Sequence, residues 1–182
     1  MDPFSRGLLA GPAAVYDAVG ERMFRRIYAV EWSAQMQYSV GNVGRVVVAR
    51  LFEGEELHAC VDQIARQTQI RCAAVLITGG FRDAAVVVGP EREQPIVPRF
   101  QPFAGPGEVL GVGTLYWDDA GPKLHMHTAI GKGGENLVGC ARRDSRTFLV
   151  LEVTIIEITG IEASRRLDPA SGMTLLHLET GG

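Results

Sequence analysis

The sequence predicts an α+β fold in which a largely antiparallel sheet packs against one main helix. Within residues 43–182, one early segment has apolar residues at i, i+3, i+4 and i+7, the spacing of an amphipathic helix. Most of the remaining segments alternate or are β-branched, and glycine or proline separates them. Such strands carry apolar residues on both faces. Since one helix covers only one face, we expect association between subunits to cover the other.

Residues 1–42 differ from the rest and are predicted to form a partly helical extension. Gly11-Pro12 precedes a helix predicted from Ala13 to about Gln37, and Gly41-Asn42 ends the segment. This helix is basic and amphipathic, so it could bind a membrane surface or a partner, although most such helices dock on their own domain. The main domain is predicted to span residues 43–182.

The main domain begins with a buried strand at Arg45–Phe52. Glu53–Glu56 then opens the helix, whose apolar positions are Leu57, Cys60, Val61, Ile64 and Ala65. Gly79-Gly80 is predicted to be a turn, and Pro95–Pro106 is predicted to be an edge strand or a loop, because proline cannot donate to a β-ladder. The other strands are predicted at Ala73–Thr78, Asp83–Val88, Glu108–Trp117, Lys123–Ile130, Asn136–Arg142, Thr147–Thr159 and, after a turn at Arg166–Pro169, Thr174–Leu178.

Composition predicts one ordinary globular domain with an extension. The chain has 182 residues, of which 46% are hydrophobic and 21% charged. No apolar run approaches the roughly 20 residues needed to span a bilayer, and we expect neither membrane association nor a signal peptide. The 3 cysteines are an odd number and widely spaced, which favours a reducing compartment. We therefore expect a cytoplasmic protein.

Charge bears on nucleic-acid binding. The formal net charge is −3, and Lys123 and Lys132 are the only lysines. Proteins that hold DNA through many phosphate contacts usually present a basic face. We therefore expect no direct DNA binding.

Two histidines and a cysteine form the candidate metal site. His125 and His127 lie two residues apart on a predicted strand, so their side chains share one face. If Gly133-Gly134 is a two-residue hairpin loop, His127 lies opposite Cys140 and His125 lies opposite Arg142. Imidazole with thiolate favours zinc among divalent transition metals. Three protein ligands would leave one position open, as in catalytic zinc sites.

Each of these side chains also has a structural interpretation. A single strand histidine is commonly half-buried with one hydrogen bond, and cysteine is a common small core residue. A Cys–His nucleophilic pair is another alternative, although no oxyanion donor can be placed around it. Arg142 belongs to a charged cluster that could simply be solvated, or it could bind a small anionic ligand beside the metal.

Several short motifs, in order, resemble the plant and prokaryote conserved (PPC) domain family over roughly residues 43–178. They are Gly80-Phe81-Arg82-Asp83-Ala84, Phe103 with Gly107-Glu108-Val109-Leu110 and Gly113, Pro122-Lys123-Leu124-His125-Met126-His127, and Val138-Gly139-Cys140. The resemblance implies an α+β domain that assembles as a homotrimer. In prokaryotic members it also implies a metal site, commonly zinc, made by three histidines.

The chain departs from this family pattern at the third ligand. His125 and His127 match the first two histidines, but Cys140 stands where the third is expected. The plant relatives carry Arg-Gly-Arg AT-hooks, and this sequence has none. We therefore expect a trimeric metal-binding protein that acts as a regulatory or interaction module. A metal-assisted enzyme for a small anionic substrate is the first alternative, and a DNA-binding protein is the second.

Overall fold

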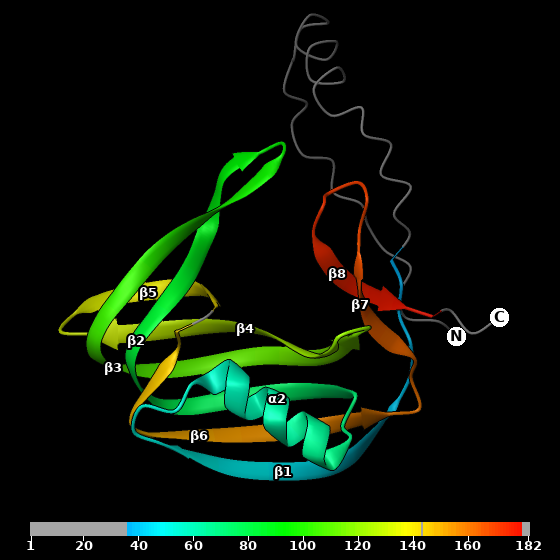
Figure 1. Cartoon of the computed structure of the whole chain (residues 1–182), viewed down its shortest axis with the longest axis horizontal. Coiled ribbons are helices and arrows are strands. Elements are labelled where there is room, and N and C mark those ends of the chain that lie inside the picture. The colour runs from blue at the N-terminus through cyan, green and yellow to red at the C-terminus, as the bar shows by residue number, and fades with distance from the viewer. Residues whose placement is uncertain (1–35, 143, 180–182) are drawn as a thin grey trace, which may run out of the picture. The chain divides into compact units, whose positions relative to one another are not determined.

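The computed structural model describes residues 36–142 and 144–179, so the predicted N-terminal helix falls almost entirely outside the described residues. Strands dominate the rest (Figure 1). In chain order the elements are β1 (Asn42–Phe52), α2 (Leu57–Thr68), β2 (Cys72–Glu93), β3 (Ile96–Asp118), β4 (Gly121–Lys132), β5 (Glu135–Ala141), β6 (Arg146–Thr159), β7 (Ala163–Leu167) and β8 (Thr174–Leu178).

These strands form a sheet in the order β1-β6-β2-β5-β4-β3-β7-β8, with a further pairing between β2 and β3. The ladders are antiparallel apart from one parallel bridge, between Trp117 of β3 and Ser164 of β7. The predicted class of a largely antiparallel sheet with one packed helix is confirmed. The sheet is more dominant than expected, because α2 has only 12 residues.

Helix α2 starts where the sequence predicts. The Glu56 carboxylate accepts a hydrogen bond from the Ala59 N–H at 2.6 Å and so caps the first turn. Gln69 ends the helix in the left-handed conformation, with φ of 57°. The buried face consists of Leu57, Val61 and Ala65. This face packs on one side of the sheet (Figure 1), against a core that includes Val75, Leu115, Met126, Leu151 and Ile155.

The predicted turn at Gly79-Gly80 is wrong, because β2 continues through both glycines. Gly79 pairs with Leu151 of β6 whereas Gly80 pairs with Phe148, so β6 carries a bulge at this point. A Cβ on Gly79, where φ is +141°, would lie 2.4 Å from the Val150 carbonyl oxygen. The glycine therefore permits close approach of the bulged strand instead of reversing the chain.

The proline-rich segment forms the edge strand that was one of its two predicted alternatives. It is the first half of β3, and it pairs with the distal half of β2 from Asp83↔Ala104 to Glu93↔Ile96. The ladder between β3 and β4 starts only at Glu108, so the prolines lie where one side of the strand has no partner in that ladder. We call this long hairpin, residues 83–104, the arm (Figure 1).

The C-terminal hairpin was predicted only in part. Strand β8 has the predicted bounds, but its partner β7 was not predicted, and the predicted turn overlaps its end. The two strands pair from Ala163↔Leu178 to Leu167↔Thr174. Strand β7 thereby lies beside the C-terminal end of β3.

Candidate metal centre

The hairpin of β4 and β5 brings the predicted ligands together. Its ladder runs from Lys132↔Glu135 to Met126↔Ala141 and sets His127 directly opposite Cys140. Gly133 and Gly134 have φ of 57° and 90°, so the two-residue loop uses the positive-φ conformation that only glycine adopts without strain.

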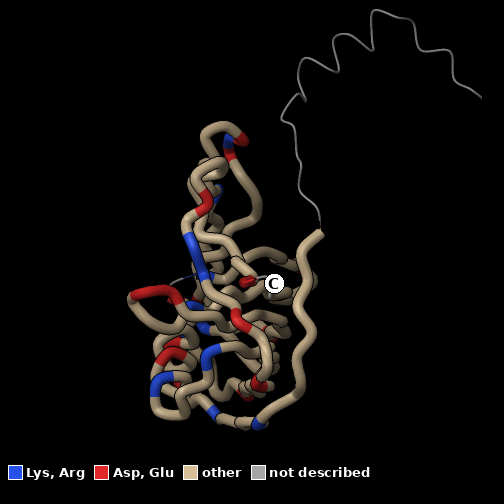
Figure 2. Tube along the Cα trace, turned by 90° about the vertical axis from the view of Figure 1, so that its right-hand side faces the viewer, with Lys and Arg blue, Asp and Glu red and all other residues tan. Residues whose placement is uncertain are grey.

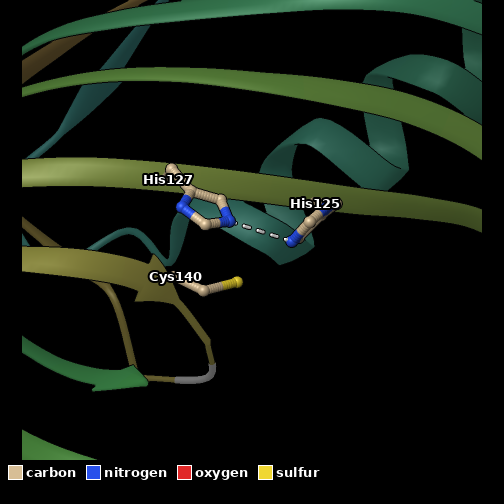
Figure 3. Close-up of side chains that lie close together, drawn as sticks. All are labelled: His125, His127 and Cys140. Atoms are coloured by element: carbon tan, nitrogen blue, oxygen red, sulfur yellow. Dashed lines mark hydrogen bonds between the residues drawn. The ribbon is translucent and has the colours of Figure 1, made fainter. Parts of the chain in front are cut away.

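The three side chains converge on one face of this hairpin (Figure 3). The Nε2 atoms of His125 and His127 lie 3.2 Å apart, and the two rings meet edge to face at a centroid distance of 4.9 Å. Each of His125, His127 and Cys140 offers one donor atom within 4.8 Å of the other two. Along β4 the intervening Met126 points into the core, as strand alternation requires.

Protonation differs between the members of this cluster. Burial, together with the positive charge of Arg165, lowers the pKa of His125 to about 4. At neutral pH this imidazole therefore offers a free lone pair. Cys140 is buried, and that burial raises the pKa of its thiol. A metal must displace the thiol proton to gain the sulfur ligand.

The donor set fits a tetrahedral transition metal. Two nitrogens bound to one zinc at about 2.0–2.1 Å lie roughly 3.3 Å apart when the site is tetrahedral. His125 and His127 already hold their Nε2 atoms at 3.2 Å. The same distance also fits a hydrogen bond between two neutral imidazoles, in which one Nε2–H donates to the other Nε2. Cys140 supplies the softer third donor, and a fourth position remains for water or a ligand.

Cys140 lies at the junction of three strands. It pairs with His127 of β4 on one side and with Val87 of the arm on the other. The preceding Gly139 makes this junction possible, because a Cβ there would lie 2.4 Å from the Val87 carbonyl oxygen. Close packing against Val87 therefore explains the glycine of the Val138-Gly139-Cys140 motif.

Arg142 does not pair with His125 as the sequence analysis predicted. Strand β5 ends at Ala141, and the Arg142 N–H donates to the Ala85 carbonyl oxygen at 2.9 Å, because the chain turns toward the arm. The Arg142 side chain lines a cavity of about 750 Å³ that Phe100 and Lys123 also border. Its positive charge adds to the effect of burial, which lowers the pKa of His125, and it opposes the larger effect of burial, which raises the pKa of the Cys140 thiol. Arg143 lies outside the described residues.

Arg165 is the residue beside the cluster that the sequence analysis missed. It lies on the unpredicted strand β7, and its Nη2 donates to Thr114 Oγ1 at 2.8 Å. Thr114 of β3 pairs directly with His125. The sequence analysis predicted the strand at Thr174–Leu178 and a turn before it, but no partner strand on the other side of that turn. A strand needs such a partner, and this requirement was the one sequence signal that could have placed Arg165 in a strand.

The face that carries the cluster is also apolar and exposed. It is opposite the face that α2 covers, and strand alternation places on it exposed apolar residues from β1, β2, β3 and β5. Its exposed large side chains are Val46, Val48, Leu76, Leu110, Val112 and Val138. The predicted uncovered face is thus present.

Comparison with known families identifies the fold. A model described as the Plants and Prokaryotes Conserved (PCC) domain matches residues 38–159. The chain belongs to this family. The resemblance inferred from the short motifs is thereby confirmed.

Solved structures agree with this assignment. A metal-containing protein from Archaeoglobus fulgidus has 23% identity and a TM-score of 0.69, with 77% of this chain and 98% of that chain covered. A PPC protein from Pyrococcus horikoshii has 21% identity and a TM-score of 0.69, with 79% and 99% covered. A candidate DNA-binding protein from Ralstonia eutropha has 16% identity and a TM-score of 0.64, with 72% and 90% covered.

At these identities the likeness shows the fold. A comparison with curated protein sequences gives no match. No helix among the described residues has the length and apolarity needed to cross a bilayer.

Proposed function

We propose that this PCC-domain protein is a homotrimer that binds one zinc, or a similar divalent transition metal, per subunit and acts as a regulatory or interaction module. His125, His127 and Cys140 would hold the metal. The observation that carries the proposal is the 3.2 Å separation of the two histidine Nε2 atoms beside the Cys140 sulfur. The metal-containing neighbour from Archaeoglobus supports it.

The trimer is supported by the uncovered apolar face. Side chains such as Leu110 of β3 and Val138 of β5 lie exposed on the face of the sheet that carries the cluster. Contiguous apolar surface of this kind marks an interaction site.

Metal analysis tests the proposal. Protein purified without chelators and dialysed against metal-free buffer should retain about one zinc per chain, as expected for a site with three protein ligands. Elemental analysis together with light scattering measures both metal content and mass. Stoichiometric metal in a monomer would contradict the trimer, and a metal-free trimer would contradict the metal site.

DNA binding is the second candidate function. The descriptions of two similar structures, from Ralstonia and from Bacteroides thetaiotaomicron, favour it. Figure 2 shows Lys and Arg interspersed with Asp and Glu along the trace, which gives little support to a phosphate-binding stripe. Anisotropy of labelled duplex DNA in a salt titration decides this point. A steep fall of affinity with salt would establish phosphate contacts.

A further inference from the structure

Arg165 approaches the candidate metal centre from the neighbouring strands. Its Nη2 atom donates to the Thr114 hydroxyl at 2.8 Å, and Thr114 is the cross-strand partner of His125. Its guanidinium also lies over the ring of the buried Tyr116, with 5.4 Å from Cζ to the ring centroid. The side chain is half-buried, so Thr114 and Tyr116 together hold the guanidinium beside His125.

The charges around this guanidinium are unbalanced. Among the described residues, the ion pairs of arginine involve Arg45, Arg82, Arg146 and Arg166, and neither Arg142 nor Arg165 has a carboxylate partner. The positive charges of Arg142 and Arg165 both act on His125 and on Cys140. A divalent metal with one thiolate would keep one positive charge, and the two arginines would add two more. An arrangement of this kind attracts an anion.

We propose that the metal-loaded site binds a small oxyanion, a carboxylate or a phosphate group, with one oxygen on the metal and another on the Arg165 guanidinium. This inference rests on the proposed metal site. The metal leaves a fourth position for an oxygen donor. The planar guanidinium presents several N–H donors, so it can bind an anion while it keeps its hydrogen bond to Thr114. Arg165, which the sequence analysis did not consider, is the principal anion-binding residue, and Arg142 adds charge from the arm side.

Cobalt-substituted protein provides the test. Co²⁺ replaces zinc in sites with histidine and cysteine ligands, and its visible spectrum changes when a ligand enters the coordination sphere. The full-length protein is loaded with Co²⁺ and titrated separately with acetate and with inorganic phosphate at constant ionic strength, to hold screening fixed. A saturable spectral change is expected. Whichever anion gives the tighter change identifies the class of ligand.

Matched variants assign the effect to Arg165. Arg165→Gln should weaken anion binding by at least about tenfold, as for loss of a hydrogen bond to a charged group. Arg166→Gln is the control, because Arg166 pairs with Glu179 on the surface, and it should change the affinity by no more than about twofold. Thr114→Val removes the hydroxyl that holds the guanidinium and should weaken binding by about twofold to tenfold.

Each outcome separates the two proposals. Failure of the wild-type protein to bind Co²⁺ would overturn the metal site and this inference together. A normal cobalt spectrum that neither anion changes would overturn the anion site and leave the metal site intact. Equal effects of Arg165→Gln and Arg166→Gln would also overturn it. If Arg165→Gln does not fold, the comparison of Thr114→Val with wild type decides, and unchanged affinity in that variant refutes the role of Arg165.

Discussion

Replacing Leu110 with Asp should dissociate the proposed trimer. Leu110 is 63% exposed on the apolar face of β3. Fully burying a leucine side chain is worth about 1.5–3 kcal/mol, so covering the exposed part would contribute roughly 1–2 kcal/mol per subunit. A buried carboxylate in its place costs several kcal/mol. At about 3 kcal/mol per subunit, the three copies would weaken association by roughly six powers of ten.

Light scattering after gel filtration measures this effect directly. The wild type should give three times the chain mass of 19.7 kDa, and Leu110→Asp should give the mass of one chain. The control is Leu167→Asp. Leu167 is 67% exposed at the end of β7, so the change adds the same charge at another exposed position. A Leu110→Asp protein that remains fully trimeric would refute the apolar face as the interface, as would equal dissociation by both variants.

Other expected outcomes concern the site and the core. His127→Ala should abolish stoichiometric zinc in elemental analysis, since two protein ligands hold zinc poorly, and a variant with full occupancy would contradict the ligand assignment. The folded-state pKa of His125 is about 4, below the value of about 6.5 for an unfolded imidazole. As pH falls, the unfolded chain takes up this proton first, so the metal-free protein should lose stability progressively from about pH 6.5 to about pH 4. Urea unfolding of the metal-free His125→Asn variant should show a smaller loss of unfolding free energy over that pH range. A pH dependence identical to that of the wild type would contradict the lowered pKa of His125. Leu115→Ala empties a fully buried position and should cost about 2–5 kcal/mol in the same assay, whereas a change below about 1 kcal/mol would mean that the core packs differently.

The β4–β5 hairpin of the candidate metal site could be predicted from sequence because residues close together in the chain determine its register. The Gly133-Gly134 loop fixes the register, and the side-chain period of two then places His127 opposite Cys140. The prediction failed two residues after Cys140, at Arg142. Arg142, which follows the end of β5, does not pair with β4 because its N–H donates to the Ala85 carbonyl oxygen of the arm, a partner distant in sequence. No alternation pattern within β5 could have indicated this.

The long strands and Arg165 were missed for the same physical reason. Gly79-Gly80 has the composition of a turn, but the bulge of β6 makes the glycines a place of close approach. Strand β7 has five residues and joins β3 through one bridge. Its position depends on tertiary contacts, so neither the strand nor the location of its arginine follows from local periodicity.

Because the proposed metal ligands come from one hairpin, the parts of the site are expected to form in a definite order. His125, His127 and Cys140 belong to two adjacent strands joined by a two-residue loop, so little chain entropy is lost when they meet. Arg165 can reach the site only after β6 and β7 have joined the sheet. We therefore expect the nascent chain to acquire its metal-binding capacity before its anion-binding capacity. Pulsed metal labelling during refolding would then detect cobalt–thiolate absorption ahead of the final tertiary signals.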